Sequence, residues 1–148
     1  MRWLPLGLVG CSLFLSSVAP AQERSPKIIE RGTGRSGDSP TEWEVTLAET
    51  IVPPGHYLGS EFRKIGEGLG IAQSVSYYFV GIEGRTVHLL AIERRVAGAE
   101  IQRLPILLPL AADDTTVLTI TPLFTKKSIR IRLKRNADNS LSASVIGP

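Results

Sequence analysis

The chain has 148 residues, a formal net charge of +3 and a single cysteine, Cys11. One cysteine cannot build an internal disulfide framework, and two histidines without a second thiol leave too few ligands for a zinc site. We therefore expect no metal and no cofactor, and a fold that rests on apolar packing alone.

The first 21 residues have the three parts of a secretory signal peptide. A charged start at Arg2 leads into an apolar stretch over residues 3–18, and residues 19–21 (Ala-Pro-Ala) provide small side chains for cleavage before Gln22. The stretch is shorter than the roughly 20 apolar residues of a membrane span. We expect an exported protein, periplasmic or secreted, without a transmembrane helix in its mature form.

A second interpretation of the same segment rests on Leu8-Val9-Gly10-Cys11, which resembles a bacterial lipobox. Only seven apolar residues precede Gly10, and the residues that follow Cys11 are mostly apolar, whereas a lipid-tethered domain usually follows a polar linker. We favour cleavage before Gln22, and a lipid anchor at Cys11 is the alternative.

Residues 22–41 have the composition of a flexible linker. They contain three glycines and two prolines among mostly polar side chains, and the pair Ile28-Ile29 alone is apolar enough for a short edge strand. Such a segment buries too little apolar surface to offset its chain entropy. We therefore expect one β domain over residues 42–148.

A period of two begins at Glu42 and indicates a half-buried strand that ends in a turn at Pro53-Pro54-Gly55. The next apolar residues, Leu58, Phe62 and Ile65, have helical spacing instead. This spacing predicts one short helix at most.

The clearest strands cover residues 74–82 and 86–93, which are rich in aromatic and β-branched residues and flank a tight turn at Glu83-Gly84. Later strands are expected over residues 101–110, 116–121, 128–135 and 141–146, the last two joined by an Asn/Asp turn. About seven strands with short turns predict an all-β fold, a small antiparallel β-sandwich or barrel.

Residues 128–135 alternate between apolar and basic side chains. In a strand, Arg130, Arg132 and Lys134 share one face, and like charges recur about every 6.6 Å. Together with Lys127 and Arg135, they are the candidate contacts for an anionic polymer, lipid head groups or an acidic partner.

The alternative is a solvated face that acidic residues of neighbouring strands neutralise, with Glu42, Glu44 or Glu93 as the expected partners. Charge is uneven along the chain, because residues 22–114 carry 10 basic and 13 acidic side chains whereas residues 115–148 carry six basic and one acidic. The basic strand therefore has few acidic neighbours in sequence.

An apolar segment with two prolines precedes this strand. Pro105 and Pro109 lack backbone donors and exclude a central strand, so the segment is expected to be an edge strand or a cover over the core. If part of it is exposed, the candidate partner edge consists of Leu104, Ile106, Leu108 and Leu110.

No catalytic motif is recognisable around His56 or His88. We expect a non-catalytic β domain that binds a macromolecular partner or an anionic surface in the cell envelope or outside the cell, and not nucleic acid. The alternatives are a small extracytoplasmic enzyme or enzyme inhibitor with a site on its loops, and a structural subunit of an envelope assembly.

Overall fold

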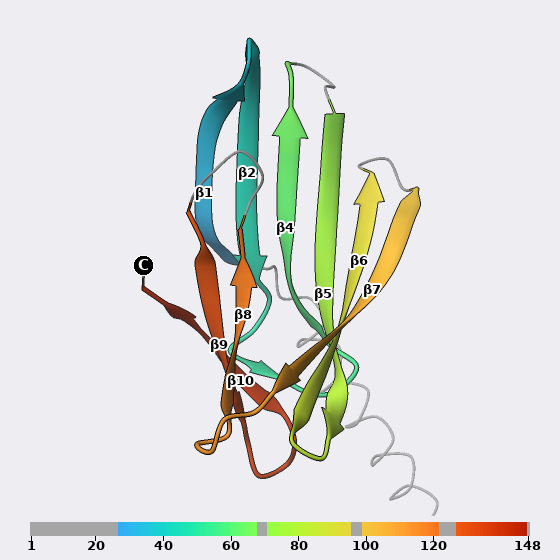
Figure 1. The fold of residues 1–148 in the computed structure, drawn as a ribbon, viewed down its shortest axis with the longest axis vertical. Helices are drawn as coiled ribbons and strands as arrows, with labels where there is room; N and C mark the ends of the chain where they lie inside the picture. Colours follow the sequence, from blue (N-terminus) through green and yellow to red (C-terminus); the bar gives the residue numbers. More distant parts are fainter. Residues whose placement is uncertain (1–26, 68–70, 96–98, 122–126, 148) are drawn as a thin grey trace, which may run out of the picture.

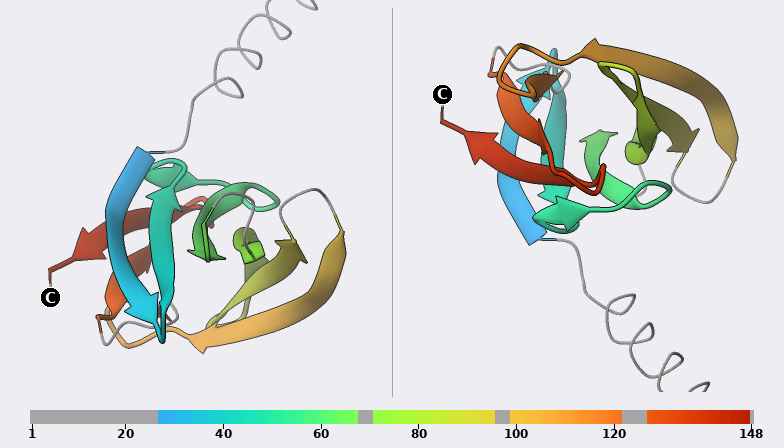
Figure 2. Two further views of the ribbon diagram at one scale, coloured as in Figure 1. Left: turned by 90° about the horizontal axis from the view of Figure 1, so that it is seen from above. Right: turned by 90° about the horizontal axis from the view of Figure 1, so that it is seen from below.

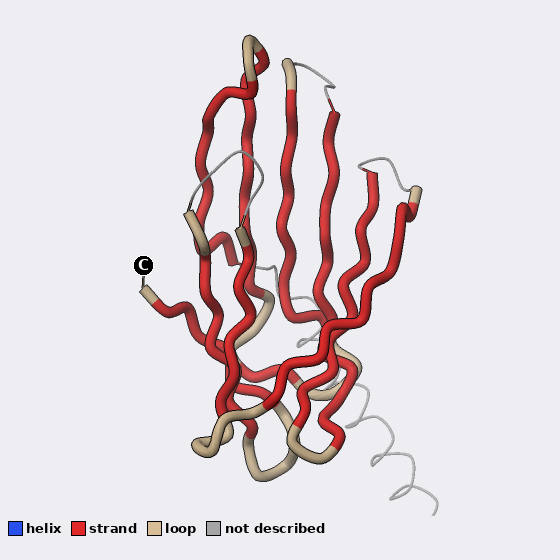
Figure 3. Tube along the Cα trace, viewed as in Figure 1, coloured by secondary structure: helices blue, strands red, loops and turns tan. Residues whose placement is uncertain are grey.

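A computed structural model describes residues 27–67, 71–95, 99–121 and 127–147. The expected signal peptide, its cleavage site and Cys11 lie outside these described residues. The described residues form strands and loops and contain no helix (Figure 3). The strands are β1 (Lys27–Ser36), β2 (Ser39–Leu47), β3 (Ile51–Val52), β4 (Tyr57–Ile65), β5 (Ile71–Glu83), β6 (Thr86–Arg95), β7 (Glu100–Pro109), β8 (Thr115–Ile120), β9 (Ile129–Arg135) and β10 (Leu141–Ile146).

These strands form two antiparallel sheets (Figure 1). The larger sheet has six strands in the order β1-β2-β4-β5-β6-β7, and the smaller has four in the order β3-β10-β9-β8. The prediction of an all-β antiparallel sandwich is confirmed, with ten strands among the described residues where about seven were expected.

The core lies between the two sheets. Val45, Phe79 and Leu89 of the six-stranded sheet and Ile131, Leu133 and Leu141 of the four-stranded sheet are almost completely buried in one apolar cluster. Burial of a side chain of this size contributes about 1.5–3 kcal/mol, so the facing apolar rows hold the sandwich together without disulfides.

Residues 27–36 form a strand where the composition predicts a linker. Strand β1 pairs with β2 from Lys27 to Ser36, and Gly37, with φ of 60°, begins the turn between them. Most side chains of β1 are exposed, because an edge strand held by backbone pairing needs little apolar surface of its own. The ordered β structure therefore starts before the expected boundary at Glu42.

The short helix that the spacing of Leu58, Phe62 and Ile65 allowed does not form, because Tyr57–Ile65 is strand β4. The register places Phe62 opposite Glu44 and Ile65 opposite Thr41, so these two apolar side chains lie on opposite faces of the sheet. A bulge between Tyr57 and Gly59 shifts the alternation near Leu58. The apparent helical spacing therefore combines apolar side chains from both faces of one strand.

Both predicted hairpins are confirmed. β5 and β6 join through Gly84 and Arg85, one residue later than expected, and Gly84 has the positive φ of 62° that the first position of a type II′ turn requires. In the turn between β9 and β10, Asp138 Oδ1 accepts hydrogen bonds from the backbone N and the Oγ of Ser140, at 3.0 and 2.6 Å.

The two sheets differ in strand length. β5 has 13 residues and β9 has seven, which correspond to about 43 and 23 Å at about 3.3 Å per residue. Figure 1 shows the upper ends of β1, β2, β4 and β5 reaching well beyond β8 and β9. Figure 2 shows that the six-stranded sheet is strongly curved, with β7 bending round towards β8. The smaller sheet therefore covers only the lower part of the larger one.

Close packing of Trp43 on β1 generates a first prediction. A Cβ atom at Gly32 would lie 2.6 Å from a ring carbon of Trp43. We expect Gly32→Ala to lower the free energy of unfolding by about 1–3 kcal/mol, as overpacking does. Urea unfolding of the purified protein measures this loss. Gly81→Ala, whose added Cβ would meet nothing within 4 Å, is the control. Equal stability of the two variants would contradict the packing of Trp43 against β1.

Candidate functional site

The predicted basic row lies on the outer face of the four-stranded sheet. In β9 the side chains of Ile129, Ile131 and Leu133 are buried in the core, and those between them are exposed to solvent. The exposed side chains are Arg130, Arg132 and Lys134. We call this surface, with the strands on either side of it, the basic face.

The strands that flank β9 bring hydroxyl and aliphatic side chains to the basic face, and no acidic ones. Across from Arg130, Arg132 and Lys134 lie Thr119, Val117 and Thr115 of β8. On the other side lie Ile146, Ser144 and Ser142 of β10. The cations of the row therefore have no carboxylate as a direct cross-strand neighbour.

The expected neutralisation by Glu42, Glu44 or Glu93 is wrong. Glu42 and Glu44 belong to β2 and Glu93 to β6, and both strands are in the six-stranded sheet. Sequence patterns locate strands but not the sheet to which each belongs, so the three glutamates were assigned to the wrong neighbours.

Among the described residues no ion pair involves Arg130, Arg132 or Lys134. Arg130 donates a long hydrogen bond of 3.4 Å to the carbonyl oxygen of Gly147. An acid that senses the charge of the row is Asp113 in the turn before β8. The hydroxyl of Thr115 lowers the pKa of that carboxyl most, and the charge of Arg132 adds a smaller contribution. Most of the positive charge of the row is therefore not neutralised by an ion pair within the described residues.

The other two basic candidates make structural contacts. Lys127 Nζ lies 2.9 Å from Glu30 Oε1 of β1 and so links the two sheets. Arg135 Nη2 lies 3.1 Å from Asp114 Oδ1. Of the five predicted basic contacts, the structure brings three together on the exposed basic face.

Asp114 connects three turns at the lower end of the molecule. It has φ of 63° and accepts contacts from Arg85 at 2.9 Å and from Arg135 at 3.1 Å. Arg85 also donates to the carbonyl oxygen of Ala111. The hydrogen bond from Arg85, with the nearby Arg135, lowers the pKa of the Asp114 carboxyl.

The predicted edge segment is β7, the terminal strand of the six-stranded sheet. Pro105 and Pro109 are four residues apart, so both direct their ring nitrogen away from β6, and the outer edge lacks donors at these positions. Ile106 and Leu108 pack against the core and Leu110 is buried, whereas Leu104 is 49% exposed. Three of the four residues of the candidate partner edge therefore cover the core and are not available to a partner.

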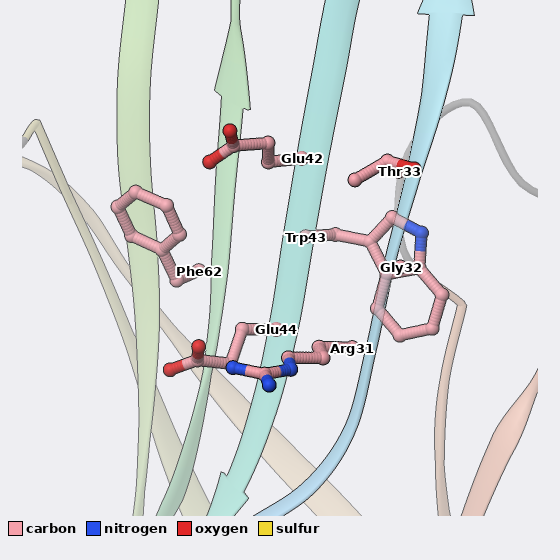
Figure 4. Close-up of a pocket in the computed structure, with 7 residues that line it drawn as sticks. All are labelled: Arg31, Gly32, Thr33, Glu42, Trp43, Glu44 and Phe62. Carbon is pink, nitrogen blue, oxygen red and sulfur yellow. The ribbon is translucent and has the colours of Figure 1, made fainter.

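A cavity with a volume of about 320 Å³ lies over β1, β2 and β4. Figure 4 shows Glu42, Glu44 and Phe62 on one side of β2 and the Trp43 ring on the other, over Gly32. A smaller cavity of about 170 Å³ lies beside His88, whose Nε2 is 3.8 Å from Glu83 Oε2. The His88 cavity is below the roughly 300 Å³ that is usual for pockets that bind drug-sized ligands.

The sequence analysis missed a polar cluster on the inner face of the six-stranded sheet. Arg63 Nε donates to Gln73 Oε1 at 3.2 Å, and the Arg63 guanidinium lies 3.7 Å from both Glu61 Oε2 and Glu93 Oε2. Gln102 Nε2 donates to Glu93 Oε2 at 3.3 Å. The alternation Glu61-x-Arg63 would have signalled it, had this segment been read as a strand.

Burial perturbs two groups in this cluster. It raises the pKa of the Glu61 carboxyl, and the Arg63 charge opposes this shift only in part. Burial, and then the charge of Glu61, raise the pKa of Tyr77 to about 12. The neighbourhood of Glu61 is therefore a poor environment for negative charge.

A scan against protein-family models and searches among curated proteins and solved structures found no match to this chain. The part of the chain that the structure describes contains no helix of the length and hydropathy of a membrane span. Within the same ranges, no three His, Cys, Asp or Glu side chains are grouped as metal ligands would be.

The Asp114 contacts predict a pH dependence of stability. Because the pKa of Asp114 is lowered in the folded state, its contribution is present above about pH 4 and is lost as the pH falls through the lowered pKa. Asp114→Asn keeps a residue that tolerates positive φ. We expect it to lower Tm at pH 7 and to reduce the loss of Tm on acidification.

Asp38→Asn is the control for this measurement, because the Asp38 side chain makes no ion pair within the described ranges. Thermal melts at neutral and acid pH compare both variants with the native protein. An acid-induced loss of Tm that is the same in Asp114→Asn and in the native protein would show that the Arg85 and Arg135 contacts do not stabilise the fold.

Proposed function

We propose that this protein is an exported binding domain that attaches to an anionic polymer or anionic surface through the basic face. The observation that carries the proposal is the exposed row of Arg130, Arg132 and Lys134, which has no acidic side chain across from it on β8 or β10. The amino-terminal residues 1–21, with the composition of a signal peptide, support action in the envelope or outside the cell.

Electrostatics favours an anionic ligand at this row. Two like charges about 6.6 Å apart in water repel by about 0.6 kcal/mol, and an anion between them replaces this repulsion by attraction. The hydroxyl groups of Thr119 and Ser144 flank the row and can donate further hydrogen bonds to anionic oxygens, whereas those of Thr115 and Ser142 already donate to Asp113 and Asn136. A strand face of this kind fits an extended ligand that runs along β9.

Removal of the row tests the proposal. We expect the triple variant Arg130→Ser, Arg132→Ser, Lys134→Ser to elute from a heparin column at lower salt than the native protein. At a fixed salt concentration, the difference in retention between the two proteins should be largest when the ionic strength is low, because about 0.1 M salt screens exposed charges over about 10 Å. Its thermal stability should change little, since exposed substitutions usually cost within about 0.5 kcal/mol each.

A matched control removes the same charge from another face. Arg31 and Arg94 lie in one row on the outer face of the six-stranded sheet, and Lys64 is close by on the same face. Replacement of these three residues by Ser should leave more of the heparin retention than the β9 variant does. If both triple variants elute at the same salt concentration, retention reflects net charge and the proposal fails.

A further inference from the structure

The inner face of the six-stranded sheet changes from apolar to polar along its strands. One row across β5 and β6 holds Phe79 opposite Leu89, and the next holds Tyr77 opposite Ala91, all buried in the core. The two rows above them, towards the upper end of the sheet, are mostly polar, with Glu61, Glu93 and Gln102 beside Val75 in the first and Arg63, Gln73 and Arg95 in the second. This change in chemistry occurs along a single face of continuous strands.

The polar rows lie in the part of the face that the four-stranded sheet does not cover. Leu104 is on the inner face, opposite Ala91, yet it is half exposed. The side chains of Arg63 and Glu93 keep 19% and 20% of their surface exposed. Figure 1 shows β4 and β5 continuing upwards past the ends of β8 and β9. Solvent therefore reaches this face from the upper end of the molecule.

The side chains of the polar rows contact one another across four strands. Arg63 of β4 bonds to Gln73 of β5 and approaches Glu93 of β6, and Gln102 of β7 bonds to Glu93. Figure 2 shows that the sheet to which these four strands belong is strongly curved. We call Arg63, Gln73, Glu93 and Gln102, with Glu61 beneath them, the polar patch.

Glu61 gives an independent indication that the polar patch is incomplete as it stands. Its side chain is only 6% exposed, and its Oε2 atom accepts no hydrogen bond. The nearest donor, Arg63 Nη1, is 3.7 Å away, which is too far for a hydrogen bond. Buried polar atoms are almost always hydrogen-bonded, so Oε2 of Glu61 is an exception that a donor from a water molecule or a ligand would remove.

We infer that the polar patch is a binding site for a neutral oligosaccharide. Guanidinium and amide donors alternate here with carboxylate and amide acceptors, so a matching ligand must both donate and accept hydrogen bonds at closely spaced positions. Hydroxyl groups do both, whereas an ammonium ion only donates and a carboxylate or phosphate only accepts. A hydroxyl that enters between Arg63 and Glu61 would supply the donor that Oε2 lacks.

This site is separate from the basic face. The polar patch lies on the inner face of the six-stranded sheet, whereas Arg130, Arg132 and Lys134 lie on the outer face of the four-stranded sheet. Its charged groups also differ, because two carboxylates accompany one guanidinium. Binding of a neutral sugar here and of a polyanion at the basic face can be measured independently.

Trp43 gives the site a spectroscopic reporter. It is the cross-strand neighbour of Arg63, and its ring extends towards Gly32 of β1 (Figure 4). After the expected cleavage, Trp43 is the only tryptophan of the protein. A ligand that contacts Arg63 should therefore change the emission of Trp43.

The test titrates maltohexaose, cellohexaose, xylohexaose and chitohexaose into the protein recovered after export. We expect at least one of them to release or absorb heat in calorimetry and to shift Trp43 emission. Glu93→Ala should weaken that binding about tenfold, as loss of one or two hydrogen bonds does. Glu44→Ala, on the opposite face of the same sheet, is the matched control and should bind as the native protein does.

Circular dichroism and thermal melts establish that each variant is folded. If Glu93→Ala fails to fold, Gln102→Ala, at an exposed position of the patch, replaces it with the same expected loss. Absence of binding for all four sugars, or equal affinity of folded Glu93→Ala and Glu44→Ala, would overturn the inference. The Arg130, Arg132 and Lys134 triple variant should bind the sugar normally, so failure at one site does not imply failure at the other.

Discussion

The mismatch in length between the two sheets is the constraint on which the rest of the structure depends. The core forms where short strands of the smaller sheet face the lower halves of long strands of the larger one. Phe79 and Leu89 are buried there against the face of β9 that carries Ile131 and Leu133. Above this level the same strands continue without a facing sheet, and their inner face carries the polar side chains of Glu61, Arg63, Gln73 and Glu93 together with a few apolar ones.

The two proposed binding surfaces follow from this arrangement. The short sheet buries one face of β9 and leaves the other, with Arg130, Arg132 and Lys134, in solvent. The long sheet extends the polar patch beyond the core, where Glu61 is buried without a hydrogen bond to Oε2. Ion pairs such as Lys127–Glu30 and Arg135–Asp114 link neighbouring elements of the sandwich.

Local patterns predicted much of this fold, because alternation and turn residues act over a few positions. Residues 128–135 alternate as expected, and the turns at Gly84 and Asn139 occur in or next to the expected segments. Such patterns do not reveal which strands pair when they are far apart in the sequence. Strand β1 is held by its pairing with β2 and not by its own apolar content. In β4, apolar side chains on both faces of the strand have a spacing in sequence that resembles that of a helix.

Local patterns also could not assign strands to sheets. The prediction of five basic contacts included Arg135, which instead binds Asp114, and the polar patch was missed because its residues come from four strands. Residues such as Glu61 and Glu93 become neighbours only when β4, β5 and β6 pair. Their shared location is a property of the sheet and not of any one segment.

Thiol accessibility along β5 and β6 tests the partial cover of the inner face most directly. The expected mature chain contains no cysteine, so Gln73→Cys and Ala91→Cys each introduce a single thiol on this face. The rate of maleimide labelling in the folded protein measures its exposure. The account predicts fast labelling at position 73 and strong protection at position 91. Equal protection at both positions would contradict it, because the upper part of the sheet would then be covered as the lower part is.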